Sequence, residues 1–188
     1  MAKGVQAGAT DTIVRNRGRD APNNKTNENL YKLLSEAGIK TTHPSQPDVD
    51  APVFLTNSIL CIKEGAMNGP ILSRWVDSCT EQHLFPLIRC LKPPVVVGMG
   101  NAGWRAVRHV FALHDAPQPI LRAAGGCWSS ENQTRVFAVG HCGPLGIINR
   151  PWPQQIADWR RIGTAISAAP LSRGEPGIDV FVTSPSGS

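Results

Sequence analysis

The sequence predicts an α/β domain, a three-layer α/β/α sandwich whose helices cover both faces of a central, mostly parallel sheet. Short apolar runs, typical of strands buried on both faces, alternate along the chain with amphipathic helical patterns. The clearest such unit is Val95-Val96-Val97, which a glycine-containing turn joins to a helix. At 188 residues the chain has the length of one domain. We place that domain at residues 1–169 and expect residues 170–188 to be a flexible tail.

Each element follows from its local pattern. Thr26 or Asn27 caps a helix whose leucines follow a three-and-four spacing, and Gly38 ends it. Residues 1–26, 114–134 and 141–153 have no clear periodicity and are expected to be loops. The other expected elements are a strand at 53–55, one or two helices over 71–91 broken at Pro86, strands at 95–97 and 135–140, helices through 104–111 and 156–166, and an additional edge strand at 180–182.

Composition narrows the class of protein. Hydrophobic residues make up 41% of the chain and charged residues 18%, a balance that excludes a mainly disordered chain. No apolar run has the roughly 18–20 residues that cross a bilayer, and the first residues do not read as a signal peptide. We therefore expect a cytoplasmic protein with no membrane partner. The net charge of +5 suits a polyanionic partner without requiring one.

The cysteines argue against a metal centre. There are five of them, an odd number, and no two are spaced as a CxxC pair. This pattern does not fit a disulfide framework or a complete zinc or iron–sulfur site. We expect free thiols, no metal and no cofactor.

Three segments should meet at the carboxyl ends of the predicted strands, where ligands bind in parallel sheets. They are Thr56-Asn57, Gly98 to Asn101, and His141 to Arg150. The glycines at 98–103 lack the spacing of a nucleotide-binding loop, and a tight turn before a helix explains them. From spacing alone, Asn57 is better explained as a turn or cap residue, and a lone His141 as a hydrogen-bonded structural residue.

The order of three longer segments adds a resemblance. FLTNSILCIKEG, CTEQHLFPLIRCLKPPVVVGMGNA and VFAVGHCGPLGIINRPWPQQIADW together resemble the uracil-DNA glycosylase superfamily across about residues 26 to 162. The resemblance implies that Asn57 reads uracil and that His141 stabilises the negative charge that grows on uracil O2 as the glycosidic bond breaks. It also implies that Leu145 fills the gap left by the flipped base. Loop residues Gly143, Pro144, Gly146 and Arg150, with Lys63 as a further cation, would contact DNA phosphates.

The N-terminal part departs from the family pattern. The family motif that carries a catalytic acid corresponds here to Gln6, Ala7 and Gly8, with Ala7 where the acid is expected. Asp11 is our candidate for its replacement and Asp20 the second. The motif is normally followed by a ring that stacks on uracil, for which Phe54 and Trp152 are substitutes. A pocket without that ring is expected to accept hypoxanthine or xanthine as well.

These observations lead to the expectation of a monomeric, monofunctional uracil-DNA glycosylase of base excision repair. Its substrate would be uracil-containing DNA, and its products free uracil and an abasic site. The missing acid motivates an alternative, a protein of the same fold that binds uracil-containing nucleic acid without cleaving it. A small-molecule α/β hydrolase or a nucleotide-binding protein is a more distant alternative, because neither a GxSxG nor a phosphate-loop signature is present.

Overall fold

The computed structural model describes residues 25–41, 53–60, 71–130, 133–168 and 179–183, the last of these as backbone only. Six residues to which the sequence analysis assigned a role lie outside these ranges: Gln6, Ala7, Gly8, Asp11, Asp20 and Lys63. The described elements, in chain order, are α2 (Lys25–Glu36), β1 (Val53–Asn57), α3 (Ser73–Cys79), the π-helical segment η1 (Thr80–Leu84), α4 (Phe85–Leu91), β2 (Val95–Met99), α5 (Gly100–Val110), α6 (Ile120–Ala123), β3 (Cys127–Ser129), β4 (Arg135–Val139), α7 (Pro144–Asn149), α8 (Trp152–Ser167) and β5 (Asp179–Thr183).

The strands form one five-stranded sheet in the order β1-β5-β2-β4-β3. All neighbouring pairs are parallel except β3 with β4, so the expected mostly parallel sheet of an α/β domain is confirmed. The expectation of an edge strand at 180–182 is wrong. These residues belong to β5, which lies between β1 and β2 and pairs with both. A strand so late in the chain therefore occupies an interior position in the sheet.

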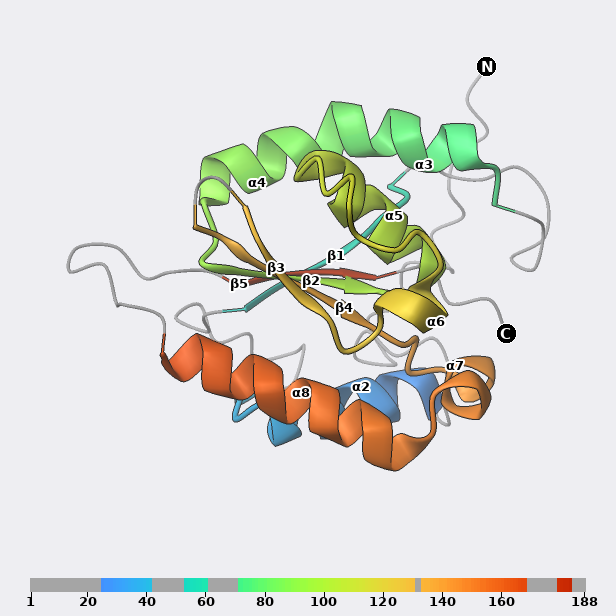
Figure 1. Cartoon of the computed structure of the whole chain (residues 1–188), viewed down its shortest axis with the longest axis vertical. Coiled ribbons are helices and arrows are strands. Elements are labelled where there is room, and N and C mark those ends of the chain that lie inside the picture. The colour runs from blue at the N-terminus through green and yellow to red at the C-terminus, as the bar shows by residue number, and fades with distance from the viewer. Residues whose placement is uncertain (1–24, 42–52, 61–70, 131–132, 169–178, 184–188) are drawn as a thin grey trace, which may run out of the picture.

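Helices cover both faces of the sheet (Figure 1). On one face, α2 and α8 pack against β2 and β4 through a core that includes Leu33, Leu34, Trp159 and Ile162. On the other face, α3 to α6 enclose a second core around Trp104. Strand β2 contributes alternate residues to the two cores, Val95, Val97 and Met99 to the first and Val96 to the second. This alternation explains why a continuous apolar run predicted a strand buried on both faces.

Two glycines allow the β2–α5 turn to be tight. Gly100, the first residue of α5, has a φ of +68°, a conformation that residues with a Cβ rarely adopt. A Cβ on Gly98 would lie 3.0 Å from the Trp104 Cα, so the absence of a side chain lets the helix return closely over its own strand. The interpretation of these glycines as turn residues, rather than as a nucleotide loop, agrees with this geometry.

Three local expectations need correction. The break expected at Pro86 is a π-helical segment, Thr80–Leu84, and α4 continues directly after it. The segment 114–134, expected to be irregular, contains α6 and β3. The loop expected over 141–153 contains α7. The helices α6 and α7 and the strand β3 have at most six residues each, too few for a periodic pattern to appear in the sequence.

Candidate functional site

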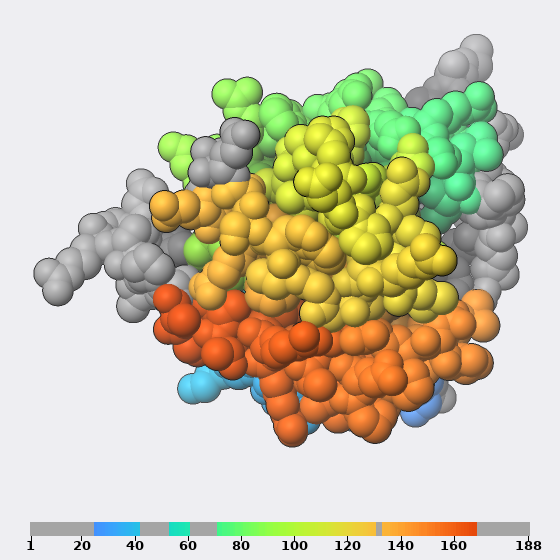
Figure 2. Space-filling view, viewed as in Figure 1, coloured from blue at the N-terminus to red at the C-terminus, as the bar shows by residue number. Residues whose placement is uncertain are grey.

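A cleft of about 1120 Å³ opens at the carboxyl ends of β2 and β4. One wall comes from α3, α5 and the segment leading to α6, and the other from the turn after β4 and the helix α7. In the space-filling view, the segment between α5 and β4 (yellow) lies between the green helices and the orange α7 and α8 (Figure 2). The volume exceeds that of a single small-molecule pocket of average size, so the cleft has room for a ligand larger than one small molecule.

His141 forms part of the cleft wall just after β4 ends. Its ring is held by the turn that follows, because the backbone N–H of Gly143 donates to Nδ1 at 3.0 Å. When Nδ1 accepts a hydrogen bond, the neutral imidazole carries its hydrogen on Nε2. A Cβ on Gly143 would come within 2.9 Å of Nδ1, so glycine at this position keeps space for the ring. The Gly143 N–H, expected to contact DNA, instead bonds to the imidazole in this structure.

The helix α2 holds the His141 turn from one side. Asn29 Nδ2 donates to the Cys142 carbonyl oxygen at 2.9 Å, and the Cys142 thiol donates to the Thr26 carbonyl oxygen at 3.4 Å. Cys142 is only 1% exposed, and this burial raises the pKa of its thiol to about 12. The thiol therefore stays protonated at neutral pH and serves packing rather than nucleophilic chemistry.

The helix α8 holds the same turn from the other side. The buried Gln155 uses its amide Nε2 to donate to the Arg150 carbonyl oxygen at 3.0 Å and to the His141 carbonyl oxygen at 3.4 Å. The two ends of the segment 141–150 are thus tied to one side chain. Gly146 packs so closely on the His141 carbonyl group that any Cβ would overlap it. These contacts fix the position of His141 relative to α7.

Leu145 lies on α7, beside Pro144 and Gly146 in the cleft wall. Its side chain is 75% exposed, and Ile148 on the same helix is 74% exposed. Only the first of these two residues lines the cleft. The structure therefore brings His141 and the expected wedge residue into one wall, together with Gly143, Pro144, Gly146 and Arg150.

Arg150 is engaged by a buried carboxylate. Its Nε and Nη2 donate to the two oxygens of Asp158, and Arg161 Nη2 donates to the same carboxylate at 2.6 Å. The Asp158 side chain is 2% exposed and that of Arg150 is 18% exposed. Arg150 thus lines the cleft, but its charge is mainly satisfied within the protein, so its contribution is to anchor the end of α7.

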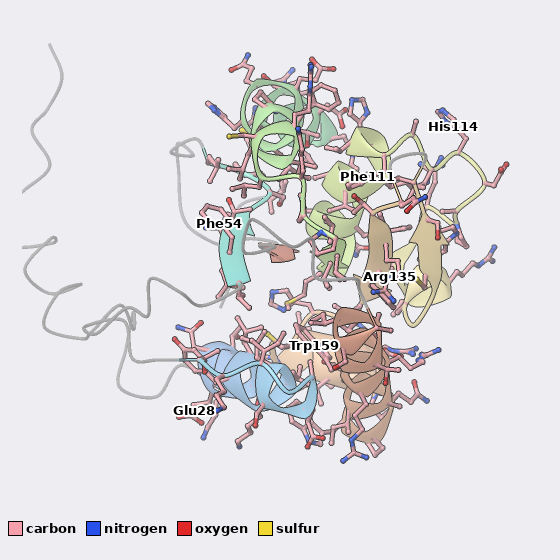
Figure 3. All side chains as sticks on the ribbon, turned by 90° about the vertical axis from the view of Figure 1, so that its left-hand side faces the viewer. Glu28, Phe54, Phe111, His114, Arg135 and Trp159 are labelled. Carbon is pink, nitrogen blue, oxygen red and sulfur yellow. The ribbon has the colours of Figure 1, made fainter. Side chains whose placement is uncertain are left out.

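Asn57 lies at the same edge of the sheet but not in this cleft wall. Its register places it opposite Thr183 of β5, at the level where β2 and β4 end. Three inter-strand steps separate β1 from β4, which corresponds to roughly 14 Å. Neither Asn57 nor the two candidate stacking rings, Phe54 and Trp152, line the cleft. Phe54 is 38% exposed on the outer strand β1 (Figure 3), and Trp152 packs against the α2–α8 core.

Asn101, at the end of the expected segment Gly98 to Asn101, lies in the opposite wall. That wall also holds residues that the sequence analysis did not single out: Asp77 on α3, Arg105, Arg108 and His109 on α5, and His114 beyond it. Their recurrence at three-and-four spacing along α5 was a detectable signal, because it places them on one helix face. Arg105 forms two hydrogen bonds of 2.8 Å with Asp77. These bonds hold the pKa of Asp77 below its usual value, against the effect of burial.

Neither a metal centre nor a membrane span is found in the parts of the chain that the structure describes. No three His, Cys, Asp or Glu side chains there are grouped as metal ligands. No described helix combines the length and the apolar character needed to cross a bilayer. No protein-family model, no curated protein and no solved structure matches the chain.

Proposed function

We propose that the protein is a monofunctional uracil-DNA glycosylase. The observation that carries the proposal is the common wall of His141 and Leu145, a positioned imidazole next to an exposed leucine at the end of a parallel strand. The segment resemblance to the uracil-DNA glycosylase superfamily supplies the reaction. Helices on both faces of the sheet support the finer fold assignment, a three-layer α/β/α sandwich of that type.

In the proposed reaction, the bond between uracil N1 and the sugar C1′ breaks and uracil leaves with the bonding electron pair. The oxygen of a water molecule bonds to C1′, and the proton that this water releases neutralises the departing uracil anion, so that free uracil and an abasic site result. The imidazole of His141 donates its Nε2 hydrogen bond to uracil O2, where the negative charge accumulates. Leu145 occupies the space that the base leaves in the stack. Asn57 lies on β1, outside the cleft wall, and we assign it uracil recognition on the segment resemblance alone. Its amide would donate to uracil O4 and accept from N3–H, which selects uracil over cytosine.

A second candidate function is binding of uracil-containing nucleic acid without cleavage. One observation favours it. Asp77 is the one acidic residue among the described residues that line the cleft. Both oxygens of its carboxylate accept hydrogen bonds from Arg105. The glycosylase therefore needs its sugar-facing acid from elsewhere, and Asp11 remains our proposal for that role.

Strand breakage distinguishes the two functions. An end-labelled oligonucleotide with one uracil is incubated with the protein and then heated in alkali, which cleaves the strand at an abasic site. The same oligonucleotide with thymine in place of uracil is the substrate control. We expect breakage with uracil only. If the protein retains the uracil oligonucleotide without breaking it, the binding function is established. If the protein neither breaks nor retains the uracil oligonucleotide, both functions are rejected.

Two variants test the roles within the site. Removing one well-placed donor to a developing anion lowers turnover about 100- to 1000-fold, so His141→Ala is expected to lose that much single-turnover excision. His83→Ala is the matched control, because His83 is an exposed histidine of η1 that does not line the cleft. Asn57→Ala is expected to reduce excision while leaving the melting temperature nearly unchanged, since Asn57 is exposed. Near-normal excision by either site variant would contradict its assigned role.

A further inference from the structure

The wall of the cleft opposite His141 carries a second charged surface, which we call the α5 wall. It consists of Arg105, Arg108 and His109 on α5 with His114 in the segment that follows. Arg105, His109 and His114 are exposed, and Arg108 is half-buried. The side-chain view shows His114 at the outer edge of the molecule, beyond Phe111 (Figure 3). None of these residues has a role in the reaction proposed above.

The partners of the two arginines set the charge of this wall. Arg108 donates from Nε to the Ala116 carbonyl oxygen at 2.9 Å and from Nη2 to the His114 carbonyl oxygen at 3.0 Å. Carbonyl groups orient a guanidinium without neutralising it, so Arg108 presents a net positive charge. Arg105 is different, because the Asp77 carboxylate binds it in a bidentate pair. On α3 and η1, the elements beside α5, Asp77 and Glu81 are the nearby acids, and Glu81 lies 3.7 Å from His109.

The spacing of the wall suits a chain of phosphates. Eight residues of helix from Asn101 to Arg108 extend over roughly 10 Å at 1.5 Å per residue. Phosphates recur at short, regular intervals along a DNA strand, so a helix face of this length can contact more than one of them. Gly100 and Asn101, at the start of the same helix, line the same cleft as His141 and Leu145. A strand with one nucleotide at His141 can therefore continue along α5.

We propose that the α5 wall binds the phosphodiester backbone of the DNA strand whose neighbouring nucleotide occupies the His141 site, and that Asp77 weakens this binding by occupying Arg105. The inference rests on the proposed function for the identity of the strand, and it adds the path that the strand takes. Arg108, whose partners are uncharged carbonyl groups, supplies the positive charge that favours an anionic partner over an apolar one. Arg105 adds its charge to the wall only when the Asp77 carboxylate does not occupy it.

Removal of Asp77 provides the test, with a matched control on the far side of the sheet. Asp77→Asn and Glu36→Gln each delete one carboxylate that pairs with a surface arginine, Arg105 and Arg160 respectively. Both variants therefore add the same charge, and only the first changes the cleft. Binding of a fluorescein-labelled, uracil-free single-stranded oligonucleotide is measured by anisotropy over a series of salt concentrations. Circular dichroism of each variant confirms its fold.

We expect Asp77→Asn to bind DNA several-fold more tightly than the unsubstituted protein and Glu36→Gln to bind like it. One additional phosphate contact steepens the slope of log K against log salt by about 0.7 for a single strand, and this increase should appear in Asp77→Asn only. The double variant Asp77→Asn/Arg105→Gln should lose the gain. Equal changes in Asp77→Asn and Glu36→Gln, a gain that survives without Arg105, or tighter binding of polyglutamate in place of DNA would overturn the proposal.

The failure of this surface and the failure of the glycosylase function have different signatures. If the unsubstituted protein breaks no uracil strand but Asp77→Asn still binds DNA more tightly through Arg105, the glycosylase is rejected and the DNA path stands. If uracil excision occurs and the Asp77 and Glu36 variants bind alike, the glycosylase stands and the path along α5 is rejected.

Discussion

Among the charged groups that the structure describes, we expect loss of the Asp158 carboxylate to lower the free energy of unfolding the most. It is 2% exposed and accepts hydrogen bonds from both Arg150 and Arg161. Asp158→Asn preserves the shape of the side chain but removes its charge, which leaves the 18% exposed Arg150 side chain without a counter-ion. Breaking a fully buried pair costs about 3–5 kcal/mol. Because Arg161 is 58% exposed and is free to turn into solvent, we expect the lower end, about 3 kcal/mol.

For a chain of 188 residues, a loss of that size lowers the melting temperature by about 6–12 °C. Urea unfolding followed by tryptophan fluorescence measures the loss in free energy of unfolding, since the buried Trp159 adjoins Asp158 in the same helix. Glu36→Gln is the control, because its pair with Arg160 is exposed and such pairs contribute about 0–1 kcal/mol. A loss below about 1 kcal/mol for Asp158→Asn, or simple additivity of Asp158→Asn and Arg150→Gln, would show that the reasoning from burial is wrong.

Four further predictions concern the His141 turn. Leu145→Ala should reduce uracil excision from duplex DNA more than excision from single strands. Ile148→Ala is the control and should change neither activity, because Ile148 is equally exposed but lies outside the cleft. Equal losses on both substrates would make Leu145 a packing residue. Gly146→Ala should displace the His141 carbonyl group, because the added Cβ would overlap it. Single-turnover excision should therefore fall at least tenfold. A fully active variant would show that the turn moves freely. At pH 8, iodoacetamide should alkylate the exposed Cys90 long before the buried Cys142, as read by peptide mass spectrometry. Burial raises the pKa of the Cys142 thiol from 9.0 to about 12. The stabilisation by the buried, protonated thiol is therefore complete below pH 9 and is lost as the pH rises toward 12. The free energy of unfolding of Cys142→Ala should depend less on pH in that range, and an identical dependence in the two proteins would contradict burial of the thiol as its cause.

Predictions from the sequence succeeded where a pattern extended over several turns or a whole buried strand. The helix ended by Gly38, the strand at Val95 to Val97 and the long C-terminal helix are all present. They failed where an element was too short to show a period. The helix α7 is such a case, because its six residues begin with a proline and include a glycine, which read as a loop. Its position is set by the hydrogen bonds that Gln155 donates to His141 and Arg150, on either side of the helix, and no local pattern encodes them.

The candidate site divides in the same way. His141, Leu145 and the residues between them are neighbours in sequence, so one loop after one strand could be predicted to carry them. The opposite wall could be predicted only in part. The spacing of Arg105, Arg108 and His109 places them on one face of α5, but Asp77 and His114 join them only when α3 and the segment after α5 pack beside that helix. The separation of Asn57 from the cleft wall has a similar origin. It follows from the insertion of β5 between β1 and β2, a pairing between segments more than 120 residues apart.

The class of the fold and the edge of the sheet that carries the candidate site follow from the sequence, because apolar periodicity dictates which residues are buried and strand ends dictate where loops emerge. The order of the strands, the interior place of β5 and the partners of Arg105, Arg108 and Arg150 follow only from the packing of the folded chain. Those outcomes depend on which backbone edges and which charges meet in space. Hydrogen bonds and ion pairs act over a few ångströms, and the distance between two residues along the chain does not predict whether they come that close.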